Sequence, residues 1–425
     1  MVLRVYKFRL YPTRAQEHAL GVLLGRLRFL YNAALQERRD GYHHGVKVTH
    51  ATQEKALTAI KNDPECPDYA GIHTHLLQDV VKRLDRAFEG FFRRLKSGQT
   101  PGYPRFKSRD RYTTFTFKDA GRGNGAAIVA GGARVRLHGI GNVKMKQHRE
   151  MEGALTTIGV TLDGDGHWYA LITREVPAKP LPATGRSVGI DVGLTTFAAL
   201  SNGELVANPR PLKTARIAVE RALRKVSRRK RGSRRRGKAR RLLAKTHAHV
   251  RNIRKDFHHK TARAIVQTYD RVAVEDLNVK GLARGMLARS VHDAGWSRFV
   301  VILTNKAEEA GREVKRVDPN GTSQDCSACG ERVPKTLDVR VHRCPCGYSM
   351  DRDVNAARTI HDRAFAVTGP GRGLRGGAAH ESAPLRSEKP LRASRESAGR
   401  GVVTEYGAPT TGGVKRRGRD GARGG

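Results

Sequence analysis

The stretch SVGIDVGLTTFAALSNGELVA, residues 187–207, decides the fold of the C-terminal half of the chain. Short apolar runs alternate in it with turn residues, which is typical of strands joined by tight turns. The pair Asn202-Gly203 is a strong signal for a two-residue hairpin turn. Asp191 ends the first apolar run. The predicted strands are Ser187–Asp191, Leu194–Leu200 and Glu204–Ala207.

Two further acidic residues occupy comparable places. Glu275 ends the apolar strand RVAVE, and Asp353 opens the final helix in the sequence DRDVNAA. The three acids are separated by 84 and 78 residues along the chain, so only the fold can bring them together. A sheet with Asp191 and Glu275 on adjacent strands, and a helix carrying Asp353 packed against it, would do so.

Three carboxylates within about 5 Å of one another repel, and they stay ionised only when metal ions are present. This arrangement is typical of two-metal phosphodiesterases, whose ions lie about 3.5–4 Å apart. Hard oxygen ligands favour two Mg2+ ions, with Mn2+ as the alternative. The pattern leaves open whether Asp351 or Asp353 binds metal. It also leaves open that the acids only cap helices or lie on the surface.

The charge of the chain indicates a polyanionic partner. Lys and Arg number 81 and Asp and Glu 40 in 425 residues, which gives a net charge of +41. This excess suits the closely spaced phosphates of a nucleic acid better than a neutral metabolite. The sequence contains no run of about 18 apolar residues, the length needed to span a membrane, and no secretion signal is visible. We therefore expect a cytoplasmic, nucleoid-associated protein.

Four of the five cysteines lie within 21 residues, in a C-x-x-C pair and a C-x-C pair. Two close pairs of thiolates surround one Zn2+ tetrahedrally in structural sites, and such a site replaces the core that a short segment lacks. Gly330 and Gly347 follow the two pairs, where a knuckle turn needs a positive φ. We assign this zinc no catalytic role. The predicted ligands are Cys326, Cys329, Cys344 and Cys346.

The N-terminal half combines helices with short strands. Apolar residues recur at spacings of three and four from Arg14 to about Arg94, which is typical of packed amphipathic helices. The segment Gly98–Lys107, rich in Gly and Pro, breaks this pattern. The strands that follow indicate a small barrel or sandwich, which the alternating segment Val2–Tyr11 would complete. They are expected over Tyr112–Lys118, Ala133–Lys146, Ala154–Leu162 and Trp168–Val176.

A basic region occupies residues 212–269, which we expect to be helical. Residues 211–260 hold 20 Lys and Arg against two acids. Ten of these charges fall in Ser227–Arg241, where they would repel one another strongly unless phosphates neutralised them. We expect His258 and His259 on the helix surface. The predicted phosphate contacts are Arg228, Arg229, Lys230, Arg234, Arg235 and Arg236.

Several segments together resemble one protein family. VGIDVGLTTFAALSNG and RVAVEDLNVKGL resemble the first two motifs of a RuvC-like nuclease with an RNase H fold. The segments DPNGTSQDCSACG, CPCGY and DRDVNAARTI follow in the order of a zinc finger and the third motif. The segments KFRLYPTRAQ, DRAFEGFFRRL and PRFK resemble the N-terminal part of proteins of the same family. The combination is similar to the TnpB family of transposon-encoded RNA-guided DNA nucleases, and the C-x-C pair is a departure from its pattern.

The resemblance implies a function and a set of roles. Asp191, Glu275 and Asp353 would be the catalytic acids, because the family's third acid is the one in D-x-N-A-A. The chain would bind a guide RNA from the transposon end and cleave double-stranded target DNA beside a short adjacent motif. Gln78 and Lys82 are the candidates for contacts with that motif.

The resemblance also implies a multidomain α+β and α/β fold. A helical recognition lobe and a small β-barrel would precede an RNase H-like (RuvC) nuclease domain with an inserted four-cysteine zinc finger. By its composition, the C-terminal tail would be disordered. The oligomeric state stays open. The expected boundaries are 1–12 and 99–180 for the wedge-like barrel, 13–98 for the recognition lobe, 185–320 and 349–368 for the nuclease domain, 321–348 for the zinc finger, and 369–425 for the tail.

Two other functions remain open from the residues alone. A transposase or recombinase that reads DNA directly needs a groove-reading helix and usually a transesterification site. The sequence shows neither a distinct helix-turn-helix nor a nucleophilic Tyr or Ser with supporting residues. An accessory DNA-binding zinc protein that regulates transposition without cleavage would keep the charge and the cysteines but would not need the three acids.

Overall fold

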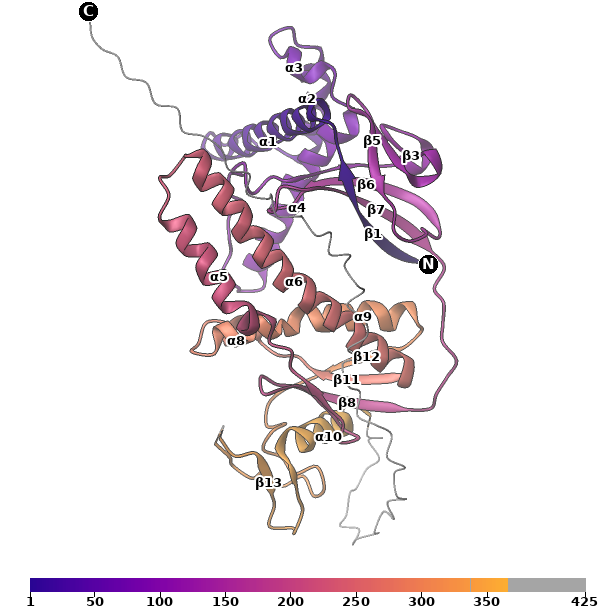
Figure 1. Cartoon of the computed structure of the whole chain (residues 1–425), viewed down its shortest axis with the longest axis vertical. Coiled ribbons are helices and arrows are strands. Elements are labelled where there is room, and N and C mark those ends of the chain that lie inside the picture. The colour runs from indigo at the N-terminus through magenta and orange to yellow at the C-terminus, as the bar shows by residue number, and fades with distance from the viewer. Residues whose placement is uncertain (337, 366–425) are drawn as a thin grey trace, which may run out of the picture. The chain divides into compact units, whose positions relative to one another are not determined.

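The computed structural model describes residues 1–336 and 338–365, so the predicted tail lies outside the described residues. The N-terminal part holds a seven-stranded antiparallel sheet in the order β2-β6-β7-β1-β5-β4-β3 (Figure 1). The first strand of the chain lies in the middle of this sheet. The strands are β1 Val2–Tyr11, β2 Thr114–Phe117, β3 Ala126–Val129, β4 Arg134–Leu137, β5 Gly141–Lys146, β6 Ala154–Leu162 and β7 Trp168–Val176.

Alternation of side chains along β1 explains its place in this sheet. Tyr6, Phe8 and Leu10 point into the core and are at most 2% exposed, while the intervening residues face outward. The predicted single strand Ala133–Lys146 was wrong, because β4 and β5 form a hairpin whose turn uses Gly139 at φ 71°. Strand β3 was not predicted, because four residues are too few to show an alternating pattern.

Four helices pack with the sheet into one hydrophobic core. The helical pattern predicted from Arg14 to Arg94 is divided among them. Helix α1 begins after Thr13, whose hydroxyl accepts a hydrogen bond from the Gln16 backbone, while the Gln16 side chain accepts one from the Thr13 backbone. This capping box satisfies two backbone donors that a helix start leaves unpaired. The helices are α1 Arg14–His43, α2 His50–Asn62, α3 Pro67–Ala70 and α4 Thr74–Lys96.

The C-terminal part is built on a five-stranded sheet in the order β10-β9-β8-β11-β12. Strands β8, β11 and β12 are parallel, and β9 and β10 run antiparallel to their neighbours. The strands predicted from the opening stretch are therefore confirmed as β8, β9 and β10. The strands are β8 Ser187–Val192, β9 Thr196–Leu200, β10 Leu205–Ala207, β11 Arg271–Glu275 and β12 Glu313–Val317.

Helices cover both faces of this sheet, with α9 on one side and α10 on the other (Figure 1). Val188 and Ile190 of β8 are fully buried in a core that they share with Phe299 of α9 and with residues of α6. Gly189 faces the opposite side, against α10. The helices are α5 Pro211–Ser227, α6 Arg234–Thr268, α7 Val279–Leu282, α8 Ala288–Ala294, α9 Trp296–Glu309 and α10 Arg352–Phe365.

Between β12 and α10 the chain forms the cysteine module, which includes the hairpin of β13 Val341–Arg343 and β14 Ser349–Asp351. The expected α+β class with several structural parts is confirmed by the two sheets, their separate cores and this module. Within residues 1–336 and 338–365, no helix is long and apolar enough to cross a membrane.

Candidate active site and metal centre

The parallel pairing of β8 with β11 brings two of the predicted acids to one edge of the sheet. Ile190 pairs with Val274, so Asp191 and Glu275 are the next residues on adjacent strands. Directly neighbouring residues on adjacent strands point to the same face. Because Ile190 and Val274 point into the core, both acids point to the opposite face, where α10 lies.

Helix α10 brings the third acid to this edge. It approaches β8 closely because Gly189 has no side chain: a Cβ there would lie 2.1 Å from the Ala357 carbonyl oxygen. Asp353 lies in the first turn of α10, and its Oδ2 would be 3.9 Å from a Cβ on Gly193. The sheet and the helix therefore bring Asp353 next to the strand that carries Asp191.

Asp351 has a different role in the structure. Its Oδ1 accepts hydrogen bonds from the backbone N–H groups of Asp353 and Val354, at 2.9 and 3.1 Å. These are donors that the start of a helix leaves unpaired, so Asp351 caps α10. The two acids therefore occupy different places: Asp351 caps the start of α10, whereas Asp353 lies beside the strand that carries Asp191.

The three acids interact through their charges. Burial raises the pKa of Asp191 well above its ordinary value, and the negative charges of Glu275 and Asp353 raise it further. Burial also raises the pKa of Glu275, against the effect of a hydrogen bond from Thr322. A cluster with these properties is unfavourable as three bare anions and becomes favourable when a cation neutralises it. Carboxylate oxygens are the ligands that Mg2+ prefers, so the residues fit divalent ions.

Neighbouring residues hold two of the carboxylates. Thr322 donates a hydrogen bond from its hydroxyl to Glu275, and Arg352 lies 3.1 Å from Asp353 through Nη2. Among residues 1–336 and 338–365, the three acids do not form a group whose ligand atoms all lie within 4.8 Å, whereas the four cysteines do. The ligand atoms of the three acids are therefore more widely separated than the cysteine sulfurs.

The four cysteines form a compact cluster. The Sγ atoms of Cys326 and Cys346 are 3.9 Å apart, and those of Cys329 and Cys344 are 3.5 Å apart. Sulfur atoms bound at 2.3 Å to one tetrahedral zinc ion would be about 3.8 Å apart, so the cluster fits such an ion. The C-x-C pair takes part in this geometry as well as the C-x-x-C pair.

The turns that follow the two cysteine pairs explain why glycine occupies positions 330 and 347. Gly330 has φ 83° and donates its N–H to the Cys326 carbonyl at 2.8 Å. Gly347 has φ 85° and donates to the Cys344 carbonyl at 3.0 Å. The prediction of positive φ at both positions is confirmed, since these tight turns favour a residue without Cβ.

One buried residue that the sequence analysis did not single out links the cysteine module to the acids. Asn355 is fully buried on α10, two residues after Asp353. Its Oδ1 accepts a hydrogen bond from the Ser327 N–H at 3.0 Å, and its Nδ2 donates to the Asp325 carbonyl at 2.8 Å. Asn355 thereby ties the first cysteine turn to the helix of the third acid. The signal was present in the DRDVNAA sequence, as a polar residue among small apolar ones.

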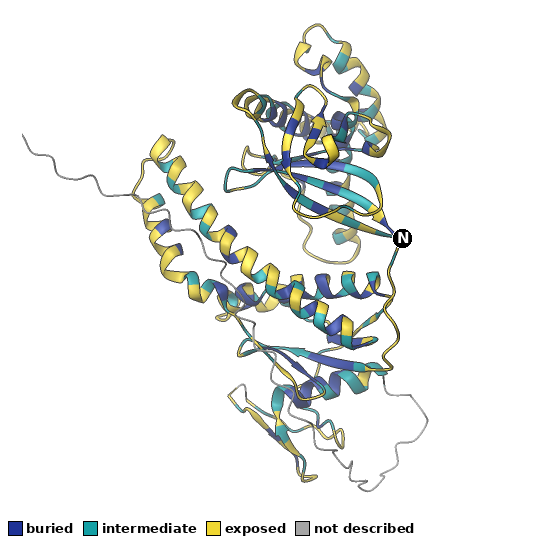
Figure 2. Cartoon of the chain, turned by 45° about the vertical axis from the view of Figure 1, so that its right-hand side comes forward, coloured by how far each residue is buried: buried dark blue, intermediate teal, exposed yellow. Residues whose placement is uncertain are grey.

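The basic region is a helical hairpin of α5 and α6, and its outer surface is exposed (Figure 2). Arg236 differs from the other predicted contacts, because it donates to the carbonyls of Val226 and Arg229 and so fixes the turn between the helices. In the described part of the chain, the remaining predicted contacts form no ion pairs with acids. These exposed residues are Arg228, Arg229, Lys230, Arg234 and Arg235.

The start of α5 is held by a buried carboxylate. Asp293 is 6% exposed and accepts hydrogen bonds from the backbone N–H groups of Leu212 and Lys213. It also forms an ion pair with Arg254 of α6 at 2.9 Å. This one side chain therefore fixes both helices of the basic hairpin to the core of the second sheet.

His258 is not on the surface of α6, so that expectation was wrong. It is fully buried against Phe197 and Phe299, and its Nε2 is 2.9 Å from the Ala294 carbonyl. Burial lowers its pKa to about 4, so it is neutral at physiological pH. The imidazole is a packed core group and not a phosphate contact.

Gln78 and Lys82 lie one turn apart on α4, and both are half-buried. The Lys82 Nζ is 3.2 Å from Asp85 and 3.7 Å from Glu89, so acids of its own helix already neutralise its charge. A partner would have to compete with these ion pairs to contact Lys82.

Three protein-family models match parts of this chain. A family model described as "Probable transposase" matches residues 170–286, and one described as "Cas12f1-like, TNB domain" matches residues 296–360. A third, "Helix-turn-helix domain", matches residues 1–47, which the structure folds as strand β1 and the single long helix α1. The matches to the first two models contain all three acids and all four cysteines.

The most informative relatives are bacterial. A "Putative RNA-guided DNA endonuclease" of Streptomyces pristinaespiralis is 35% identical, over 88% of this chain and 92% of its own length. The "Putative RNA-guided DNA endonuclease InsQ" of Escherichia coli (strain K12) is 27% identical, over 88% of this chain and 96% of its own length. The chain therefore belongs to the TnpB family.

A solved structure shares the fold. The protein in the cryo-EM structure of the Cas12f1-sgRNA-target DNA complex aligns with a TM-score of 0.54 at 13% sequence identity. The alignment covers 85% of this chain and 98% of that chain. At this identity the likeness concerns the fold alone.

Proposed function

We propose that this protein is a transposon-encoded, RNA-guided DNA endonuclease that cleaves its target by two-metal phosphodiester hydrolysis. The single observation that carries the proposal is the convergence of Asp191, Glu275 and Asp353 at one edge of the second sheet. The names of the relatives support the same activity. A regulator that only binds DNA would not need three acids whose mutual repulsion opposes folding.

We assign the five-stranded sheet to a RuvC-like nuclease domain with an RNase H-like fold. The sheet order supports this assignment, with three parallel strands flanked by an antiparallel hairpin. The proposed division keeps the boundaries expected from the sequence. It comprises a wedge-like barrel at 1–12 and 99–180, a recognition lobe at 13–98, the nuclease domain at 185–320 and 349–368, and the zinc finger at 321–348.

The residues of the site would divide the work of catalysis between them. Asp191, Glu275 and Asp353 would bind two divalent ions, Mg2+ or Mn2+, through their carboxylate oxygens. Bound ions of this kind activate water and stabilise the leaving oxygen of an in-line displacement. Thr322 orients Glu275 through its hydrogen bond, and Asp351 holds the first turn of α10 in place. Arg352 would release Asp353 as an ion binds, because the Arg352 guanidinium and the metal ion compete for the same carboxylate.

We propose that the four cysteines bind one structural zinc ion. Their sulfur separations and their place at the end of α10 support this role. The site would fix the segment from Asp325 to Ser327, to which Asn355 is hydrogen-bonded. The zinc would thus act on catalysis through the position of α10 and not by contact with substrate.

The partners we propose are a guide RNA from the transposon end and a double-stranded target DNA with a short adjacent motif. The exposed cations near the turn of the α5–α6 hairpin, which form no ion pair with an acid of the described residues, suit backbone phosphates, which base pairing leaves accessible in a heteroduplex. Gln78 and Lys82 remain proposed contacts to the adjacent motif. A DNA substrate would place the protein at the nucleoid.

The test is to express the full chain together with its transposon end, purify it, and sequence any RNA that co-purifies. Cleavage of matching DNA is then measured in Mg2+ with the wild type, with Asp191→Ala and with Asp276→Ala. Asp276 follows Glu275 but is exposed and pairs with Arg316, so it serves as a matched control. We expect Asp191→Ala to lose at least about 1,000-fold in cleavage rate while it keeps the RNA. Equal cleavage by Asp191→Ala would overturn the proposal.

A further inference from the structure

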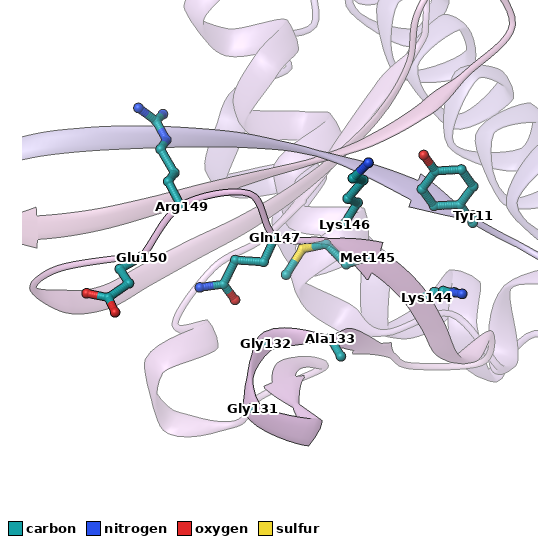
Figure 3. A pocket seen from close by; sticks show the side chains of 10 residues that line it. All are labelled: Tyr11, Gly131, Gly132, Ala133, Lys144, Met145, Lys146, Gln147, Arg149 and Glu150. Carbon is teal, nitrogen blue, oxygen red and sulfur yellow. The ribbon is translucent and has the colours of Figure 1, made fainter. Parts of the chain in front are cut away.

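The orientation of Glu275 depends on a neighbouring side chain more than on the pocket that it lines. Figure 3 shows a pocket of about 830 Å3 that is lined by residues of β1 and β5 and contains none of the three acids. Glu275 lines a smaller pocket of about 160 Å3, whose other walls include the apolar side chains of Val192 and Val300. Apolar side chains donate no hydrogen bond to a carboxylate. The orienting contact is therefore Thr322, whose hydroxyl donates to Glu275.

Thr322 is itself held in place by the segment between β12 and the first cysteine. We call this segment, residues 318–325, the Thr322 loop. It forms no helix or strand, and it contains Pro319 as well as Gly321 at φ 76°. Thr322 is 3% exposed, and the Asp325 N–H donates to the Gly321 carbonyl at 2.8 Å. A segment with so little regular structure keeps its position through contacts with other elements.

One side chain of α10 holds this loop at three points. Arg363 lies in the last turn of α10. Its Nη1 donates hydrogen bonds to the backbone carbonyls of Asp318 and Asn320, at 2.9 and 2.8 Å. Its Nη2 lies 2.6 Å from the carboxylate of Asp325. Because a guanidinium is planar and its donors have fixed directions, these contacts fix the orientation of the loop as well as its distance from the helix.

Asp325, at the end of the Thr322 loop, is shared between two arginines. Its Oδ1 accepts a hydrogen bond from Arg332 at 2.8 Å, and its Oδ2 accepts the one from Arg363. The Asp325 side chain is 17% exposed, so these charge-assisted hydrogen bonds are partly shielded from water. Its backbone carbonyl accepts a hydrogen bond from Asn355. The end of the loop thus has several contacts, whereas its beginning is held to α10 through Arg363.

Helix α10 therefore affects two of the three carboxylates. Asp353 lies in its first turn, and Arg363 follows ten residues later, about 15 Å along the helix. The helix is fixed against β8 by its close approach at Gly189. It carries Asp353 directly, and it acts on Glu275 through Arg363, the Thr322 loop and the Thr322 hydroxyl.

We infer that Arg363 is a positioning residue for the metal site: it fixes the Thr322 loop against α10 and thereby holds the Glu275 carboxylate in place for a divalent ion. This inference rests on the proposed function for the presence of that ion. Arg363 contacts neither the ion nor the DNA, so it is not a catalytic residue. Its removal should loosen the loop and weaken metal binding, and should leave the zinc in place, because Arg332 and Asn355 still hold Asp325.

The first experiment measures the loop itself. The full chain is purified with its RNA, and amide hydrogen exchange is followed by mass spectrometry before Mg2+ is added. In Arg363→Gln, peptides that cover residues 318–325 should exchange about tenfold faster than in the wild type, while the peptide with Gly330 exchanges at the wild-type rate. Arg316→Gln is the matched control, because Arg316 lies at the end of β12 but pairs with Asp276 and not with the loop.

The second experiment measures the metal site. Cleavage rate is recorded over a range of Mg2+ concentrations, and zinc content and thermal unfolding are measured on the same preparations. Arg363→Gln should need about tenfold more Mg2+ for half its maximal rate and should approach the wild-type rate when Mg2+ is saturating. Arg316→Gln should behave like the wild type. This pattern is expected when a metal ligand is held less firmly and the chemical step is unchanged.

A conservative variant tests the direct effect of charge. The positive charge of Arg363 also acts on Glu275 through space, which would be a different reason for the same loss. Arg363→Lys keeps this charge but has no planar fork to bind two carbonyls and a carboxylate together. We expect Arg363→Lys to need about threefold more Mg2+ than the wild type and to show faster exchange in the loop. Full recovery of both properties in Arg363→Lys would overturn the inference.

The remaining outcomes separate this inference from the proposed function. If the wild type does not cleave matching DNA in Mg2+, the proposed function fails and this inference fails with it. If the wild type cleaves, and Arg363→Gln matches it either in loop exchange or in Mg2+ requirement, the inference alone fails. Loss of zinc in Arg363→Gln, or an equal fall in rate at every Mg2+ concentration, would reveal general structural damage and also overturns it.

Discussion

The cysteine module and the acidic site are two candidate metal sites that the fold assembles in different ways. The four cysteines come from 21 consecutive residues, and their sulfur atoms lie within 4.8 Å of one another. The three acids come from positions as far apart as Asp191 and Asp353, and they meet only because β8, β11 and α10 pack together. We call the first site closed, because its four ligand atoms can surround one ion, and the second open, because its ligand atoms are more widely separated.

This difference follows from what each site has to do. A closed site of four thiolates leaves no position for substrate, so it stabilises structure. In the proposed function the acidic site would have to admit ions and a phosphate, which suits carboxylates held by replaceable partners such as Arg352 and Thr322. Asn355 connects the two sites, which means that damage to the closed site should also affect the open one.

Among the changes that test the link between the two sites, the largest effect is expected from breaking the closed site. Cys326→Ser should lose its zinc, unfold the module, lower the soluble yield and reduce DNA cleavage by about 100-fold or more, because the turn that holds Asn355 is lost. Elemental analysis of the purified protein measures the zinc, and a cleavage assay measures the activity. Cys66→Ser is the control. Because Cys66 lies apart from the module, this variant should keep both the zinc and the cleavage activity. Unchanged zinc content in Cys326→Ser contradicts the assignment.

A smaller effect is expected from breaking only the connection. Asn355→Ala should keep its zinc but cleave DNA about 10- to 100-fold more slowly, because α10 is no longer tied to the first cysteine turn. Asn62→Ala, at the exposed end of α2, is the control and should cleave normally. Zinc content and cleavage rate are measured on the same preparations. Full activity in Asn355→Ala would show that the two sites are independent.

The smallest expected effect is on stability and depends on pH. The pKa of Asp191 is raised above 3.8 in the folded chain, so its ionisation opposes folding. This cost is absent below pH 3.8 and appears as the pH rises through the folded-state pKa. Without added divalent ions, Asp191→Asn should therefore be about 0.5–2 kcal/mol more stable than the wild type at pH 7.5, with no gain near pH 4.

Denaturant unfolding at the two pH values measures this difference. Asp276→Asn is the control and should bring no gain, because Asp276 is exposed and paired with Arg316. Added Mg2+ should reduce the advantage of Asp191→Asn, since the ion stabilises only the wild type. An equal gain at both pH values would mean that the charge of Asp191 is not the cause.

Much of this organisation was predictable because it rests on local patterns. The cysteine spacing, Gly330 and Gly347 carry a local turn geometry, alternation predicted β1, and a short apolar run predicted β8. Short or exceptional elements were not predictable in the same way. Strand β3 has only four residues, and His258 has the polarity of a surface residue although it is packed among aromatic rings.

The sequence by itself determined which residues are candidates for chemistry: the acids at the ends of apolar segments, the paired cysteines and the density of positive charge. Those properties are fixed by residue type and by spacing along a few turns of chain. Only the tertiary structure decided which groups meet. The register of β8 with β11, the close approach of α10 at Gly189 and the outward face of β1 depend on contacts between residues remote in sequence, and no local pattern encodes such contacts.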